Sequence, residues 1–277
     1  MHKPLTILLI YEIKKKPQIE HLENSFIEER LEQYFLTNGK ERKQLEEEFE
    51  KKQDKIIKSK IFKKVVKEIR EEIGHIYGQF LTQKFKKKEK ILLKNDLNEF
   101  LLLHKSTRER INYYDEIYSK IFSWYKPKHI VDLCCGMNPL SYPIMKIKPK
   151  YLAIDLNPRD MEFLNSFFMK NKIKGEAIPC DVSSLEFLKD KKINEADLVF
   201  LFKAIDSLET LKKNISKTLL ENLPQKKIVV SFPTKSLIAK KKIKEQDRNW
   251  FLNYLKKKEW EYEQLNIENE IFFLITK

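Results

Sequence analysis

Three short segments of this sequence combine small and acidic residues in an order that suits a nucleoside ligand. A glycine lets the backbone turn tightly and approach a ligand closely. A carboxylate after the next strand can accept both hydroxyls of a ribose. An acid beside an apolar residue after a third strand can bind the edge and the face of an adenine. The segments contain Cys134, Cys135, Gly136 and Asn138, then Asp155, and then Asp181 and Val182.

The number of glycines argues against a dinucleotide. A dinucleotide-binding loop normally has the pattern GxGxxG, which places a helix N-terminus on the pyrophosphate. Only Gly136 is present in this turn. S-adenosylmethionine has no phosphate to hold, so it fits the looser pattern, and we expect it to be the cofactor. The alternative is that Asp155 and Asp181 only cap helices or turn the chain.

A parallel sheet would bring these residues together, and the second half of the chain predicts one. Short apolar strands are expected at 129–134, 151–155, 176–180, 197–202 and 227–232, alternating with helices. Asn157 followed by Pro158 is typical of a helix start. Two last strands, near 260–265 and 270–276, predict an antiparallel pair. Ligands bind beyond the carboxyl ends of parallel strands, where the polar residues lie.

The first part of the chain predicts helices instead. Apolar residues between Ile61 and Ile76 recur at a helical period. Another helix is expected over 106–125, because Ser106 and Glu109 match a capping box. We therefore divide the chain into a helical, basic domain over 1–104 and an α/β domain over 105–277.

The composition favours a polyanionic partner. The formal net charge is +14, and residues 51–94 hold 15 Lys and Arg against five Asp and Glu. Such an excess suits a phosphate backbone, and Lys86, Lys87 and Lys88 are candidate RNA contacts within it. Solvated helix faces or a generally Lys-rich proteome would produce the same excess.

The cysteines and apolar runs indicate a cytoplasmic protein. Three cysteines without a CxxC or Cys/His pattern argue against disulfides and against a zinc site, so we expect no metal. The apolar run from Leu5 to Tyr11 is too short to cross a membrane, and no cleavage site follows it. We expect no membrane partner and a monomer.

Four strings carry a resemblance to a known family. They include a Cys-Gly-x-Asn-Pro-Leu motif and a Ser-Phe-Pro-Thr-Lys-Ser-Leu motif. From about residue 100 to the C-terminus, the chain resembles the aminoglycoside-resistance family of 16S rRNA (guanine-N7) methyltransferases, the ArmA/Rmt type. The strings are Leu103–Arg110, Val131–Leu140, Asp197–Lys203 and Val230–Leu237.

The resemblance implies a class I, Rossmann-like methyltransferase sheet after an all-helical domain. It also implies methyl transfer to guanine N7 in the decoding region of 16S rRNA, in the small ribosomal subunit, and with it aminoglycoside resistance. Guanine N7 carries a free lone pair and loses no proton on methylation. We therefore assign no catalytic acid or base and expect only positioning groups.

Basic residues near the expected methyl donor are candidates for positioning and RNA binding. Arg108 or Arg110 could pair with the carboxylate of the cofactor. Lys203 ends the fourth strand and Lys235 follows the fifth, so both could hold the acceptor. We interpret the segment after the fifth strand as a cationic, phosphate-tracking loop. Its residues are Lys235, Ser236, Lys240, Lys241 and Lys242.

Two departures from the family leave other readings open. Ile238–Lys242 stands where the family often has a glycine-rich stretch, and Pro179–Val182 matches only loosely. A methyltransferase for another RNA site or base is one alternative. An enzyme that methylates an exocyclic amine would normally have an Asn/Asp-Pro-Pro-Tyr/Phe string after the fourth strand. This sequence has Phe202–Ile205 there instead, which argues against an amine acceptor. A non-catalytic RNA-binding protein with this fold is another alternative.

Overall fold

The computed structural model describes residues 2–235 and 248–277. The chain forms two compact units, Met1–Gly78 and Gln79–Lys277. This division lies earlier in the chain than the boundary after residue 104 that the sequence predicts. The reason is that apolar side chains of the intervening segment, including Phe100, Leu101 and Leu103, belong to the core of the second unit.

The first unit is helical. Ser59 begins the long helix α4 by accepting a hydrogen bond from the Phe62 N–H. The apolar residues of α4 that recur at a helical period are buried, as predicted. Its elements are α1 (Lys3–Lys14), α2 (Asn24–Thr37), α3 (Gly39–Lys51), η1 (Gln53–Lys58) and α4 (Lys60–Ile76).

A run of short helices opens the second unit. The prediction of one helix over 106–125, capped by Ser106, was wrong. The chain makes a tight turn there, because the Tyr113 N–H bonds to the Arg110 carbonyl three residues back. Ser106 is not the cap either: His104 occupies the N-cap position of α7 without a side-chain capping hydrogen bond. The Thr107 hydroxyl instead bonds to the carbonyls of Leu101 and His104. The elements are η2 (Gly78–Phe80), η3 (Gln83–Lys87), α5 (Lys88–Lys94), α6 (Leu97–Leu101), α7 (Lys105–Arg110) and α8 (Tyr114–Trp124).

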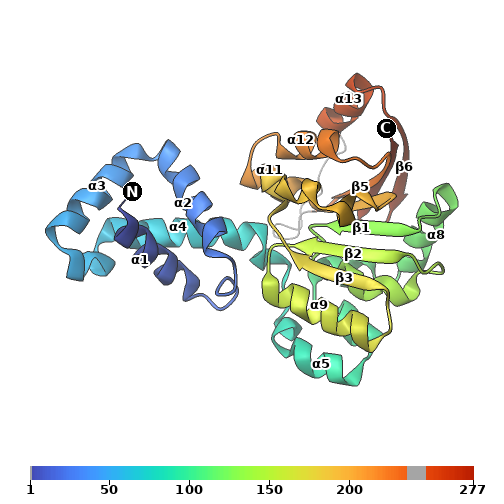
Figure 1. Cartoon of the computed structure of the whole chain (residues 1–277), viewed down its shortest axis with the longest axis horizontal. Helices are drawn as coiled ribbons and strands as arrows, with labels where there is room; N and C mark the ends of the chain where they lie inside the picture. The colour runs from blue at the N-terminus through green and yellow to red at the C-terminus, as the bar shows by residue number, and fades with distance from the viewer. Residues whose placement is uncertain (1, 236–247) are drawn as a thin grey trace. The chain divides into compact units, whose positions relative to one another are not determined.

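The predicted sheet is confirmed. It has seven strands in the order β3-β2-β1-β4-β5-β7-β6. Figure 1 shows β3, β2 and β1 side by side, in that order. The first five strands pair in parallel, and β7 pairs antiparallel with both β5 and β6. The strands are β1 (His129–Leu133), β2 (Lys150–Asp155), β3 (Gly175–Pro179), β4 (Leu198–Phe202), β5 (Lys227–Pro233), β6 (Glu261–Ile267) and β7 (Glu270–Thr276).

Helices connect the parallel strands. Asn157 caps α9 through hydrogen bonds from the Arg159 and Asp160 N–H groups, as its place before Pro158 predicted. None of the helices in the described residues is long and apolar enough to span a membrane. The connecting elements are η4 (Asn138–Ile144), α9 (Pro158–Lys170), η5 (Val182–Ser184), η6 (Glu186–Lys189), α10 (Lys191–Asn194), α11 (Ile205–Leu211), α12 (Ile215–Asn222) and α13 (Asn249–Lys257).

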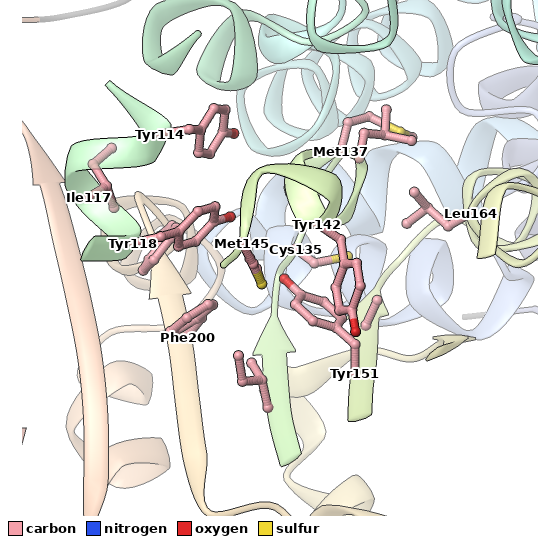
Figure 2. Packing of buried hydrophobic residues seen from close by; sticks show 14 of the residues in the cluster. Tyr114, Ile117, Tyr118, Cys135, Met137, Tyr142, Met145, Tyr151, Leu164 and Phe200 are labelled. Atoms are coloured by element: carbon pink, nitrogen blue, oxygen red, sulfur yellow. The ribbon is translucent and has the colours of Figure 1, made fainter. Parts of the chain in front are cut away.

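Aromatic side chains of α8 pack onto the sheet. The rings of Tyr114 and Tyr118 stack with centroids 5.5 Å apart, and Tyr118 stacks on Phe200 of β4 at 6.5 Å. Figure 2 shows these rings on one side of the cluster, with Tyr142 and Tyr151 beside Cys135. This core therefore fixes the carboxyl ends of β1 and β4 against α8.

A buried carboxylate joins the helical entry segment to the sheet. Glu270, at the start of β7, accepts two hydrogen bonds from Arg110 at 2.8 and 2.6 Å. Ser231 of β5 also donates to it, and the Lys203 ammonium lies 3.3 Å away. Burial would raise the pKa of Glu270, but Arg110 and Lys203 outweigh burial and hold this pKa below its usual value.

We expect the Arg110→Met substitution to lower the free energy of unfolding by about 3–5 kcal/mol, because it leaves a carboxylate buried without its main partner. Denaturant unfolding followed by circular dichroism measures this change. The double variant Arg110→Met, Glu270→Leu is the control and should recover much of the stability, since no charge is then left unpaired. A single variant as stable as the parent would contradict this role for the pair.

Candidate functional site

The loop after β1 is held in a conformation that suits a ligand at its backbone. Cys134 and Gly136 both have positive φ angles, of 53° and 49°. The Cys135 N–H donates to the Ile154 carbonyl of β2, which holds the loop against the neighbouring strand. A Cβ atom at Gly136 would lie 3.1 Å from the His104 ring, so both conformation and space require glycine here.

Asp155 lies at the end of β2, as predicted, and its carboxylate is bound to the loop after β1. Its Oδ2 accepts the Gly136 N–H at 2.7 Å, and its Oδ1 accepts the Leu156 N–H at 2.7 Å. Each carboxylate oxygen keeps a second lone pair that can accept a ribose hydroxyl. Burial raises the pKa of Asp155 to about 6, although the two backbone hydrogen bonds act against this increase.

Asp181 and Val182 lie after β3, as expected. Asp181 begins η5 by accepting a hydrogen bond from the Ser183 N–H at 2.8 Å, and Val182 is buried. This cap uses one oxygen of Asp181 and leaves the carboxylate half-buried. The structure therefore shows a capping role for Asp181, and ligand binding by it remains a prediction.

A buried polar network beneath the loop was not predicted. Asp132 of β1 accepts hydrogen bonds from the Tyr151 hydroxyl at 2.6 Å and from Asn138 at 2.9 Å. Asn138 in turn accepts one from Tyr114 at 3.1 Å. The Asn138 side chain thus supports the loop from inside, and cofactor binding by this residue remains a prediction. The signal for this network was a single acid inside the apolar strand His129–Leu133.

Burial raises the pKa of Asp132 to about 7, and its hydrogen bonds with Tyr151 and Asn138 oppose that change. Its Oδ1 has no hydrogen-bond partner among the described residues. Asp132 and Asp155 are thus two acids with raised pKa values, under and beside one loop. Their ionised forms would be favoured by a cationic ligand.

Lys203 follows β4 with a positive φ of 56° and is buried. Its N–H donates to Ser231 Oγ at 3.0 Å, and its ammonium pairs with Glu109 at 2.7 Å as well as with Glu270. Lys203 therefore lies at the carboxyl edge of the sheet, as predicted, but two carboxylates hold its ammonium. Glu109 is partly exposed, so it forms the outer end of this chain of ion pairs.

His104 connects the helical entry segment to the loop. Its ring stacks on Phe80 with centroids 5.4 Å apart and also contacts Gly136. Burial, followed by the nearby Arg110, Lys203 and Lys105, lowers the pKa of His104 to about 3. A neutral aromatic ring therefore packs against the loop at all physiological pH values.

The other predicted basic residues have different surroundings. Arg108, Lys235, Lys86 and Lys87 are exposed. Lys88 instead packs against Phe85 and Phe163 and pairs with the buried Asp160, so its ammonium is already neutralised. The remaining candidates of the predicted cationic loop lie outside the described residues; they are Ser236, Lys240, Lys241 and Lys242.

Among the described residues, no group of three or more His, Cys, Asp or Glu side chains could hold a metal ion. The polar groups present are the loop backbone and three acids: Asp132 of β1, Asp155 of β2 and Asp181 after β3. This arrangement at the carboxyl ends of adjacent parallel strands can hold a nucleoside and a nearby positive charge.

Comparison with known proteins agrees with this geometry. Residues 89–275 match the family model described as ribosomal RNA methyltransferase (FmrO). A Micromonospora rosea protein named 16S rRNA (guanine(1405)-N(7))-methyltransferase is 30% identical over 63% of this chain, a match that spans only 64% of that relative's length. A Serratia marcescens protein of the same name is 29% identical over 78% of this chain and 84% of its own.

Solved structures show the same fold over nearly the whole chain. The 16S rRNA methyltransferase RmtF, in complex with S-adenosyl-L-homocysteine, covers 100% of this chain and 99% of its own with a TM-score of 0.77 and 20% identity. RmtB covers 98% of both chains with a TM-score of 0.72 and 23% identity. The fold is thus that of these class I methyltransferases. With more than half of its residues matched by the family model, the chain belongs to the ribosomal RNA methyltransferase family.

Proposed function

We propose that this protein transfers a methyl group from S-adenosylmethionine to guanine N7 in the decoding region of 16S rRNA. The observation that carries the proposal is the Asp155 carboxylate at the end of β2, bound to the Gly136 N–H and still able to accept two hydroxyls. The family match and the names of the curated relatives support the reaction and its substrate.

The residues at the edge of the sheet fit this cofactor. Asp155 would hold the ribose hydroxyls, and Asp181 with Val182 would bind the adenine. The Cys135–Gly136 backbone would contact the amino-acid part, whose carboxylate the exposed Arg108 could pair with. Bound S-adenosylmethionine supplies a methyl group on a cationic sulfonium. The nearby acids Asp132 and Asp155 favour that positive charge.

The protein's part in the reaction is to position the acceptor. The N7 lone pair of guanine attacks the methyl group without losing a proton, so no general base is needed. Lys203 is suited to positioning, because Glu109 and Glu270 fix its ammonium at the end of β4. Lys235, exposed after β5, would hold a neighbouring phosphate.

The proposed partner is the small ribosomal subunit or its rRNA, with the protein acting in the cytoplasm. Exposed lysines supply the attraction to phosphates in both units of the chain. In the first unit, they gather between the end of α3 and the start of α4. They are Lys51, Lys52, Lys55, Lys58, Lys60 and Lys63. In the second unit, Lys86 and Lys87 of η3 are exposed, whereas Lys88 is held by Asp160.

We expect the affinity for S-adenosylhomocysteine to fall as the pH drops through about 6, where Asp155 gains a proton and loses acceptor capacity. Titration calorimetry between about pH 5 and 8 should show up to a tenfold decrease per unit below the pKa. Asp155→Ala should bind about 10- to 150-fold more weakly at pH 8, since the variant cannot form hydrogen bonds to a charged group there.

The Asp155→Ala variant is also the control for the pH profile. Asp132 titrates in both proteins, so the difference between the two profiles isolates Asp155. Cofactor binding by the parent that does not change through pH 6, or a variant that binds like the parent, would remove Asp155 from the site.

The methylated atom can be identified chemically. We expect 16S rRNA from 30S subunits incubated with the protein and S-adenosylmethionine to carry N7-methylguanine, because this acceptor needs no base. Borohydride reduction and aniline cleavage should then produce one new primer-extension stop in the decoding region. Lys203→Ala should abolish the stop while cofactor binding persists. Methyladenosine found by mass spectrometry instead would contradict the proposed acceptor.

Charge reversal tests the RNA contact. Lys86→Glu with Lys87→Glu should weaken binding to 30S subunits and flatten its dependence on salt, by about 0.7–0.9 in log–log slope for each phosphate that is no longer bound. Cofactor binding should not change. The matched control is Lys256→Glu with Lys257→Glu, two exposed lysines at the end of α13. Equal salt slopes for the two double variants would show that η3 does not contact RNA.

A further inference from the structure

A hollow lies at the opposite edge of the sheet from Asp155. The cleft has a volume of about 660 Å³ and opens at the amino ends of β1, β2 and β3. The strand register places His129 beside Lys150, and Tyr151 beside Gly175, at this end. The loop after β1 and the acids that we assign to the cofactor lie at the carboxyl ends, so the two places are separate.

The lining of this cleft is strongly basic. Lys192 pairs with Glu176 at 2.7 Å, and Lys150 pairs with Glu195 at 3.5 Å. Lys128 and Lys174 have exposed side chains and form no ion pair with any residue that the structure describes. An anion entering the cleft would therefore meet unneutralised positive charge. The lysines of the lining are Lys128, Lys148, Lys150, Lys174 and Lys192.

His129 supplies a polar group that the protein itself does not satisfy. The residue is only 6% exposed, and its Nε2 atom has no hydrogen-bond partner among the described residues. Burial, and then the charge of Lys150, lowers the pKa of His129, so the ring is neutral at physiological pH. Its backbone N–H is fixed by Asp197 at 3.0 Å, which anchors the residue at the start of β1.

The free nitrogen is an acceptor. The imidazole makes a hydrogen bond with the Glu195 backbone that acts to raise the pKa of His129, as donation to a carbonyl does. Nε2 has no partner in the described part of the chain, so we assign this bond, and with it the proton of the neutral ring, to Nδ1. Nε2 is then a buried lone pair on a residue that lines the cleft. Leaving such a group unsatisfied is unfavourable, and a ligand that offers a donor would satisfy it.

We propose that this cleft binds a ribose phosphate, with Lys128 and Lys174 on the phosphate and His129 Nε2 accepting a hydrogen bond from the ribose 2′-hydroxyl. An inorganic anion would satisfy the lysines but would offer no donor to Nε2. A ribose phosphate offers both groups on one small unit. The 2′-hydroxyl is the sugar donor that stays free both in a ribonucleotide and within an RNA strand.

The test measures binding to the full-length protein saturated with S-adenosylhomocysteine, so that the cofactor site is closed to nucleotides. Calorimetry compares uridine monophosphate, its 2′-deoxy form, inorganic phosphate and a five-residue oligouridylate. We expect the ribose form to bind about fivefold more tightly than the deoxy form, the usual effect of one hydrogen bond. The double variant Lys128→Glu, Lys174→Glu should bind every ligand with an affinity lower on the order of tenfold.

The His129→Phe substitution tests the contact with the ribose hydroxyl separately from the contacts with the phosphate. It should lower the affinity for uridine monophosphate to that of the deoxy form and leave inorganic phosphate unchanged. Thermal unfolding checks that this core substitution folds, and the lysine double variant tests the cleft independently if it does not. Lys256→Glu with Lys257→Glu, which makes the same charge change elsewhere, should bind like the parent.

The ligands also identify the natural source. Binding of uridine monophosphate and the oligouridylate with similar affinity indicates a free ribonucleotide, whereas an oligouridylate that binds much more tightly than uridine monophosphate indicates an RNA strand. The proposal fails if neither binds, if the ribose and deoxy forms bind equally to the parent, or if the lysine double variant binds like its control. None of these results depends on methyl transfer, so failure at this cleft is distinguishable from failure of the proposed reaction.

Discussion

The site depends on one buried carboxylate, Glu270. It is placed by the antiparallel pairing of β7 with β5, and it gathers donors from three other elements: Arg110 of α7, Ser231 of β5 and Lys203 after β4. Removing charges from water is unfavourable unless each is paired, so these elements must adopt one mutual arrangement. The helix α7 that is fixed in this way begins directly after His104, whose ring packs against Gly136. One ion cluster therefore connects the acceptor side of the sheet to the cofactor loop.

That loop is shaped mainly by backbone groups. Asp155 binds two main-chain N–H groups, and the network of Asp132, Asn138 and Tyr151 supports the turn from below. Such a fixed loop suits a reaction in which the protein aligns two reactants and moves no proton. The rate then depends on geometry, and rigid backbone contacts hold geometry better than long side chains do.

Local patterns predicted the strands, the Asn157 cap and the places of Gly136 and Asp155 at the ends of their strands, because each depends on neighbours in sequence or on the edge where parallel strands end. The break between α7 and α8 was not predictable in that way, since Arg110 turns inward to a partner 160 residues away. Lys88 was assigned to RNA from its basic neighbours, but a distant Asp160 neutralises it. Asn138 looked like a ligand contact and is instead held by a buried acid. In each case a polar partner that the local sequence pattern does not reveal holds the side chain.

The charges of the chain are divided by depth. The whole protein is strongly basic, yet the carboxyl edge of the sheet contains Asp132, Asp155 and Asp181, and its lysine there is neutralised by Glu109 and Glu270. Acids near a cationic sulfonium stabilise it in the ground state, and exposed lysines attract a polyanion from solution. If the lysines reached the cofactor, they would repel the sulfonium; if the acids reached the surface, they would repel the RNA. Under the proposed function, acids set deeper than the exposed lysines would let one small protein bind ligands of opposite charge next to each other.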